Sequence, residues 1–212
     1  MEELIVTAFT TLLVVIDPVG VAPIFMGLTL RADARNRRLM ALRGVLLAAA
    51  ILVVFAFIGH RLLTVLGVGL PAFRIAGGAL LFLLAVDMLL ARPSGLRSTT
   101  GEEDEEARHV EDISVFPLAI PLLAGPGAMT SIVLLMGRTG EDPWRVAALL
   151  GVLAGVLALT LVALLFAGVL ARVLGRTGAN VISRVLGIVL AALAVQFMLD
   201  GLAGAGMIPG GA

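Results

Sequence analysis

The sequence predicts an all-α integral membrane protein with six transmembrane helices, arranged as two inverted three-helix repeats in which helices one and four are broken. The first observation is composition, because 60% of the 212 residues are hydrophobic and only 14% are charged, against about a quarter charged in soluble domains. The second is the length of the apolar runs, since 18 or more apolar residues can cross a hydrocarbon core of about 30 Å. The third is a set of motifs that recur in both halves of the chain.

Six apolar segments correspond to the six predicted helices. They cover residues 4–28, 42–66, 71–91, 115–137, 145–170 and 182–203. A polar stretch over 92–114 separates the third segment from the fourth and carries a run of acidic residues that begins at Glu102. Such a run is typical of a solvated linker; a calcium or partner site is the alternative, although the spaced signature of a calcium loop is missing. The predicted organisation is therefore a first repeat over 1–91, a cytoplasmic linker over 92–114 and a second repeat over 115–212.

The evidence for a repeat is a set of three local matches at almost the same offset. DPVG at 17–20 matches GPG at 125–127, RIAGGAL from Arg74 matches RVLGIVL from Arg184, and AVD at 85–87 matches AVQ at 194–196. Three matches at nearly one offset indicate an internal duplication. Because each half has an odd number of spans, the second half must enter the membrane from the opposite side. Inverted repeats of this kind are typical of secondary transporters.

Arginine placement predicts the orientation. One face receives Arg31, Arg35, Arg37, Arg38, Arg43, Arg92, Arg97, Arg108, Arg172, Arg176 and Arg184, whereas the other receives Arg61, Arg74, Arg138 and Arg145. The positive-inside rule places the richer face in the cytoplasm and both termini outside. Glu2 and Glu3 stand where a signal peptide carries basic residues, so we expect the first span to be retained. The predicted location is the plasma (inner) membrane, with multiple passes through the lipid bilayer.

Helix-breaking residues interrupt the first and fourth segments near their middles. Pro18 and Pro126 each lack an amide hydrogen and leave the carbonyl four residues earlier unpaired. Glycines at 20, 125 and 127 add conformational freedom. An unpaired backbone group in lipid costs several kcal/mol, so a broken helix is tolerated only against protein or a water-filled cavity. The alternative is a pair of kinked helices that simply pack tightly.

Two broken helices would present half-helix N-termini, whose free amides suit a small carboxylate. Small residues leave room only for a small ligand, Thr130 and Ser131 add hydroxyls, and Asp17 could meet an ammonium group. We therefore predict a site for a small zwitterion. The candidate substrate-binding residues are Asp17, Pro18, Gly20, Gly125, Pro126, Gly127, Ala128 and Thr130. Asp17 also has the position of an N-cap for the half-helix that begins at Pro18, and transfer of a proton through Asp17 is a further hypothesis.

Other polar and small residues have simpler interpretations. Asp87 and Asp200 lie toward segment ends, where anchoring at the membrane interface explains them. Small residues at 77–78, 151/155 and 191–192 predict close helix packing.

Several functional classes are disfavoured by composition. The chain has no Cys, so it has no disulfide or thiolate metal site, and with no Lys it has no standard P-loop. An intramembrane enzyme is disfavoured because both histidines, His60 and His109, lie at segment ends and no GxSxG motif occurs. A net charge of zero gives no indication of nucleic-acid binding. We expect no metal and no cofactor.

With these motifs in view, the chain resembles the MarC family, also described as the neutral amino acid transporter family of six-helix membrane proteins. The resemblance lies in DPVGVAPIF (17–25), FRIAGGALLFLLAVDML (73–89), FPLAIPLLAGPGAM (116–129) and VISRVLGIVLAALAVQFMLDG (181–201). It implies a bacterial or archaeal plasma-membrane protein related to at least one transporter of glycine, alanine and similar amino acids. The expected function is a secondary transporter of small neutral amino acids working by alternating access, coupled to a proton or to sodium. The alternative is an exporter or channel for another small solute.

Overall fold

The computed structural model describes residues 1–29, 32–90, 112–140 and 142–208, and these residues form helices and no strand. In chain order the elements are α1 (Glu2–Ile16), α2 (Pro18–Leu28), α3 (Ala34–Val65), α4 (Leu70–Leu90), η1 (Ser114–Leu123), α6 (Pro126–Thr139), α7 (Pro143–Leu165) and α8 (Ala167–Gly204). Most of the predicted linker, with its acidic run, lies outside the described residues. So do Arg31, Arg92, Arg97 and Arg108 of the orientation argument.

The described residues hold five helical segments long and apolar enough to span a membrane, with α1 and α2 counted together as one. A sixth is present if η1 and α6, which meet at an angle of 55°, are counted as one bent span. Large apolar side chains also cover the outside of the bundle: Val54, Phe57 and Ile58 of α3 are each about half exposed. An apolar exterior suits contact with lipid. The chain is therefore an all-α integral membrane protein, as predicted.

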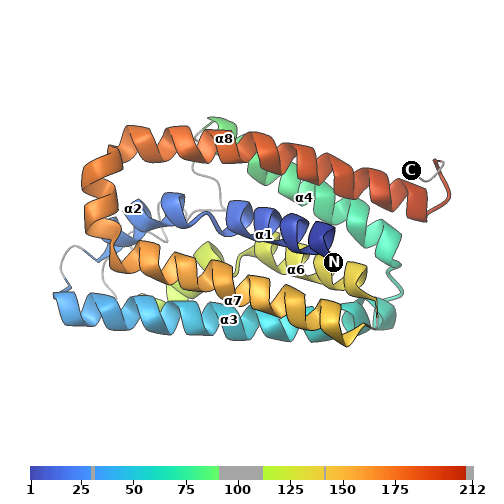
Figure 1. Cartoon of the computed structure of the whole chain (residues 1–212), viewed down its shortest axis with the longest axis horizontal. Coiled ribbons are helices and arrows are strands. Elements are labelled where there is room, and N and C mark those ends of the chain that lie inside the picture. Colours follow the sequence, from blue (N-terminus) through green and yellow to red (C-terminus); the bar gives the residue numbers. More distant parts are fainter. Residues whose placement is uncertain (30–31, 91–111, 141, 209–212) are drawn as a thin grey trace.

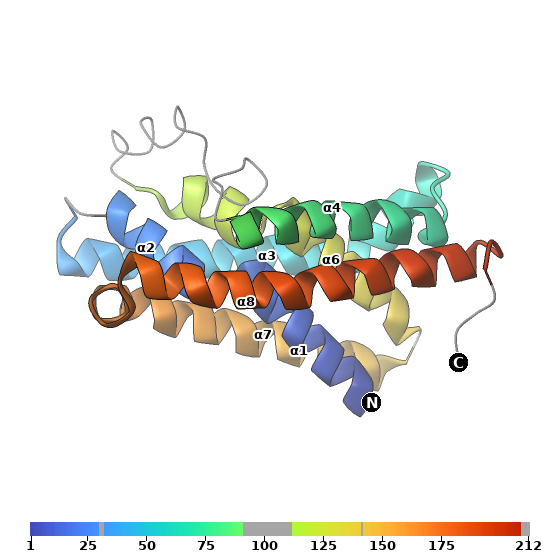
Figure 2. The same ribbon diagram turned by 90° about the horizontal axis from the view of Figure 1, so that it is seen from above.

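The helices run roughly along one common axis (Figure 1). α8 packs along α4, while α3 packs against η1, α6 and α7. α1 and α6 lie between these layers and contact each other. Met1 and the C-terminal end of α8 point toward the same end of the bundle in both views (Figures 1 and 2). The two breaks are in the interior of the bundle, where Asp17, Leu123 and Ala124 are fully buried.

Glycines allow α4 and α8 to approach closely. A Cβ atom at Gly78 of α4 would lie 2.7 Å from the carbonyl oxygen of Ala194 on α8, and one at Gly201 would lie 2.8 Å from the carbonyl oxygen of Pro71. Close backbone approach at small residues is the usual packing mode of membrane helices. The prediction of close packing at 77–78 is therefore confirmed. The same prediction at Gly151 and Gly155 is wrong, because both lie on an exposed face of α7 with nothing near them.

Two helices extend beyond their predicted limits. α3 starts at Ala34 instead of residue 42, because the Asp33 side chain caps it by accepting a hydrogen bond from the Asn36 amide at 2.8 Å. The predicted turn before segment six is also helical. α8 begins at Ala167 and changes direction at Gly175, where φ is +60°, and Figure 1 shows the sharp corner at this end of the bundle.

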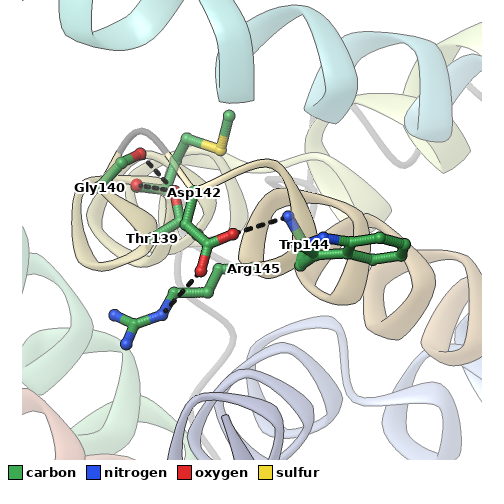
Figure 3. A network of polar contacts seen from close by, with 6 residues as sticks. Thr139, Gly140, Asp142, Trp144 and Arg145 are labelled. Atoms are coloured by element: carbon green, nitrogen blue, oxygen red, sulfur yellow. Dashed lines mark hydrogen bonds and ion pairs between the residues drawn. The ribbon is translucent and has the colours of Figure 1, made fainter.

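The turn between α6 and α7 is fixed by local polar contacts (Figure 3). Asp142 caps α7 by accepting a hydrogen bond from the Trp144 amide at 2.9 Å, and it pairs with Arg145 at 3.5 Å. The Thr139 hydroxyl donates to the Gly140 carbonyl at 3.1 Å and also to the carbonyl of Met136. Trp144 is 79% exposed, which is typical of tryptophan at a membrane interface.

Candidate binding site at the broken helices

The first break is a single residue wide and lies at Asp17. This residue ends α1 and precedes α2, with φ at +44° and ψ at 72°. A left-handed backbone is costly for most residues but is tolerated by aspartate. Pro18 follows as the first residue of α2, where its missing amide hydrogen costs nothing. The predicted break in the first span is therefore confirmed.

The Asp17 side chain is fully buried and accepts hydrogen bonds from two directions. Oδ1 accepts from the Gly20 amide at 3.0 Å, so the predicted N-cap is confirmed. Oδ2 accepts from the Ser183 hydroxyl at 2.8 Å, and Ser183 is itself buried on α8. A buried carboxylate is stable only when its oxygens are hydrogen-bonded. Asp17 therefore ties the start of α2 to α8, across 166 residues of sequence.

The second break is wider than the GPG motif suggested. Prolines 117 and 121 push the residues before them into extended geometry, as prolines generally do. Phe116 has φ −125° and ψ 129°, and Ile120 has φ −129° and ψ 124°. Hydrogen bonds in η1 therefore join residues five apart, as from the Ala124 amide to the Ala119 carbonyl at 2.8 Å. The fourth span is therefore irregular over its entire first half, upstream of the GPG motif at 125–127.

α3 supports both pieces of this bent span. A Cβ atom at Gly44 would lie 2.4 Å from a methyl group of Leu118 in η1, and one at Gly59 would lie 2.4 Å from a methyl group of Val133 in α6. The two glycines are about 22 Å apart along the helix axis, at 1.5 Å per residue. Since a hydrocarbon core is about 30 Å thick, η1 and α6 follow α3 through most of that thickness.

At the N-terminus of α6 Gly125, Gly127 and Ala128 are buried and Pro126 is exposed, and this end has no side-chain cap among the described residues. Gly125 precedes the helix with extended geometry, and Pro126 is its first residue. The first amides of a helix have no partner within the helix. At α6 they include Gly127 and Ala128, which are both buried. This end differs from the start of α2, where Asp17 supplies a cap.

A small hollow, which we call the α6 hollow, lies against this uncapped end. It is lined by Val15 of α1, Leu84 of α4, residues 121–123 of η1, and Gly125, Gly127 and Ala128. Its volume of about 10 Å³ is about that needed for one water molecule. A Cβ atom at Gly127 would lie 3.0 Å from Leu84 and 3.3 Å from Val15. The second break therefore lies directly against the helical turn that ends in the first break.

The structure divides the predicted site residues into two groups. Gly125, Gly127 and Ala128 line the α6 hollow. Asp17, Pro18 and Gly20 form the first break, and the Asp17 carboxylate points to Gly20 and Ser183. The remaining two do not line the hollow. Pro126 is exposed, and Thr130 is buried with its methyl group facing Gly77 of α4.

Two polar residues at the site were not predicted. Ser183 contacts Asp17 from a distant part of the chain, and no local pattern indicates that contact. Thr11 lies on α1 before the first break and is fully buried. Its polarity inside an apolar segment was a usable signal. Ser131, noted only for its hydroxyl, is also fully buried.

Charged contacts flank the bundle at two other places. Arg138 of α6 forms an ion pair with Asp200 of α8, which also accepts a hydrogen bond from Gln196 at 2.8 Å. Arg43 of α3 pairs with Asp112 at 2.9 Å. Hydrogen bonds from Ser114, and to a smaller extent Arg43, hold the pKa of Asp112 below its usual value of 3.8. Asp112 is at the end of the predicted linker and thus attaches the start of η1 to α3.

The family match and the relatives found by comparison with known proteins agree with each other. Residues 2–206 match the family described as "MarC family integral membrane protein". A UPF0056 membrane protein of Archaeoglobus fulgidus is 40% identical over 196 residues, covering 92% of this chain and 91% of the relative. UPF0056 membrane protein YvbG of Bacillus subtilis is 35% identical over 205 residues, covering 96% of each chain. No solved structure matches. By sequence match over nearly its whole length and by its helical membrane architecture, the chain belongs to the MarC family of integral membrane proteins.

Proposed function

We propose that the protein is a secondary transporter of small neutral amino acids in the plasma membrane, working by alternating access. The observation that carries this proposal is the buried, uncapped N-terminus of α6, which opens onto the α6 hollow beside the first break. The free amides of a buried helix end need a side chain, water or a ligand as a partner. A transported ligand would supply that partner here.

The chemistry of this helix end favours an anionic group on the ligand. Pro126 has no amide hydrogen, and the Met129 amide already bonds to the Gly125 carbonyl at 3.0 Å. The amides of Gly127 and Ala128 are thus the ones that face a ligand, at the positive end of the helix dipole. A carboxylate suits this position. Small side chains around it limit the ligand to a small amino acid.

The size of the hollow supports a closed conformation in this structure. A volume of about 10 Å³ holds one water molecule and no amino acid. Substrate entry therefore requires η1 and α6 to move relative to α1 and α4. Alternating access supplies such a movement, and the predicted inverted repeat would allow it toward either side of the membrane.

Asp17 is the proposed coupling residue, because it is a fully buried carboxylate at the first break. Ionisable groups inside a membrane protein often carry protons or bind ions. Its contacts with Gly20 and Ser183 join α2 to α8, so a change of charge at Asp17 would loosen that connection. The arginine distribution supports an orientation with both termini outside the cell.

Uptake of labelled glycine and alanine into proteoliposomes tests the proposal. We expect saturable accumulation against the amino acid gradient when a proton or sodium gradient is imposed, with the two gradients varied separately. Flux that only equilibrates glycine would instead indicate a channel. No flux of either amino acid under any gradient would contradict the proposed function.

A further inference from the structure

Two buried hydroxyl groups, on the two helices α1 and α6 that meet at the α6 hollow, have no hydrogen-bond partner in the described part of the chain. They belong to Thr11 of α1 and Ser131 of α6, and both residues are 0% exposed. Other buried threonines behave differently: Thr160 donates to the Val156 carbonyl at 2.8 Å, and Thr29 donates to the Phe25 carbonyl at 2.7 Å. A buried hydroxyl without a partner lowers stability. Neither residue lines the α6 hollow in this closed conformation, but two such groups on the two helices that meet there point to a ligand that they contact when the hollow opens.

Helix geometry places the two hydroxyls at the same level of the bundle. Val15 and Gly127 touch across the interface between α1 and α6, and the two helices run antiparallel (Figures 1 and 2). Thr11 lies one turn before Val15 on the same face of α1, and Ser131 lies one turn after Gly127 on the same face of α6. Because the helices are antiparallel, Thr11 and Ser131 are displaced in the same direction along the bundle from the contact between Val15 and Gly127. The Ser131 side chain leans back toward the N-terminus of α6, and hence toward the hollow, whereas the Thr11 side chain leans toward the start of α1.

The hydroxyls and the α6 N-terminus offer opposite chemistry at a short separation. Backbone amides donate hydrogen bonds to a carboxylate, whereas hydroxyl oxygens can accept them from an ammonium group, which has three donors and no acceptor. One helical turn is about 5.4 Å. An α-amino acid carries both charged groups on one carbon, and it can bridge this distance with a hydrogen bond at each end.

We infer that Thr11 and Ser131 form the ammonium subsite of the transporter, with the substrate carboxylate at the amides of Gly127 and Ala128. The inference rests on the proposed function and names the chemical class of the substrate, an unblocked α-amino acid. It also assigns one subsite residue to each broken span.

Binding of labelled glycine to the purified protein in detergent tests this subsite. Thr11→Val and Ser131→Ala remove one hydroxyl each, and we expect each to weaken glycine binding about tenfold or more, the usual effect of losing a hydrogen bond to a charged group. Thr11→Ser retains the hydroxyl and should bind as the unaltered protein does. Thr160→Val, which removes a buried hydroxyl from α7, is the matched control and should leave glycine binding unchanged.

Two further measurements distinguish a direct effect on glycine binding from an effect on protein stability. Acetate has no ammonium group. Its affinity, measured by competition with labelled glycine, should be equal in the unaltered protein, Thr11→Val and Ser131→Ala. Without substrate, both variants should unfold at the same temperature as the unaltered protein or higher, because an unsatisfied buried hydroxyl has been removed.

The outcomes distinguish the subsite from the function. If the unaltered protein binds glycine and both variants bind it equally well, the subsite is wrong and the proposed function stands. Lower thermal stability of both variants with unchanged glycine binding would likewise overturn the subsite and assign the hydroxyls to a structural water. If the unaltered protein binds neither glycine nor alanine, the subsite and the proposed function are both wrong.

Discussion

At the scale of single residues, Asp17 stabilises the first break in three ways. Its backbone takes the left-handed conformation, one carboxylate oxygen caps α2, and the other accepts a hydrogen bond from Ser183 of α8. Asparagine could adopt the left-handed conformation and cap α2, but it carries no charge. The capping role was predictable because it depends on the adjacent Asp-Pro pair. The contact with Ser183 was not, because it joins residues far apart in sequence.

Substitutions at Asp17 should separate structure from function. Asp17→Ala should destabilise the protein by about 2–4 kcal/mol, since it removes a cap, strains a left-handed residue and leaves Ser183 unpaired. Asp17→Asn should cost about 1 kcal/mol or less but should abolish gradient-driven uptake. Thermal unfolding in detergent and proteoliposome uptake measure the two effects. Normal gradient-driven uptake by Asp17→Asn would rule out a coupling role for the carboxylate.

At the scale of helices, glycines decide which faces pack together. Gly78 and Gly201 let α4 and α8 approach closely, whereas Gly151 and Gly155 lie on an open face. The sequence could not distinguish these cases, because residues facing lipid and residues facing protein are both apolar in a membrane helix. The extended residues of η1, by contrast, follow from the local effect of Pro117 and Pro121.

A matched pair of alanine substitutions tests the glycine packing. Gly78→Ala should destabilise the protein by about 1–3 kcal/mol, because the new methyl group would meet the Ala194 carbonyl at 2.7 Å. The methyl group added by Gly151→Ala would meet no atom within 4 Å. This substitution should be neutral or should stabilise the helix by about 1 kcal/mol at most. Unfolding in a denaturing detergent measures both. Equal stability of the two variants would contradict close packing of α4 on α8.

The attachment of η1 to α3 should depend on pH through Asp112. Because folding lowers the pKa of Asp112, its contribution to stability is present above the usual value of 3.8 and is lost as the pH falls through the lower folded value. Asp112→Asn should therefore destabilise the protein at neutral pH and make no difference in strong acid.

Thermal unfolding from neutral to acidic pH measures this effect. Arg43→Gln should preserve most of the pH dependence, because hydrogen bonds from Ser114 lower the pKa more than Arg43 does. If Asp112→Asn and the unaltered protein lose stability in parallel across the whole range, the pKa of Asp112 does not contribute.

At the scale of the whole molecule, the two broken spans meet inside the bundle and the unbroken helices surround them. The number and type of spans were predictable from hydropathy, and the positions of both breaks were predictable from proline and glycine. The size of the α6 hollow was not, because it depends on how side chains of α1, α4 and η1 pack at one point. The inverted repeat stays a prediction, and it would supply the second conformation that transport requires.

The most direct test uses the absence of cysteine from the 212-residue sequence. Ala128→Cys places a single thiol at the buried end of α6, and a small thiol reagent should label it only when the α6 hollow opens. Saturating glycine should slow that labelling strongly, and it should not affect Trp144→Cys, whose position is exposed at the start of α7. If glycine and alanine leave the labelling rate of Ala128→Cys unchanged, the broken helices do not hold the substrate.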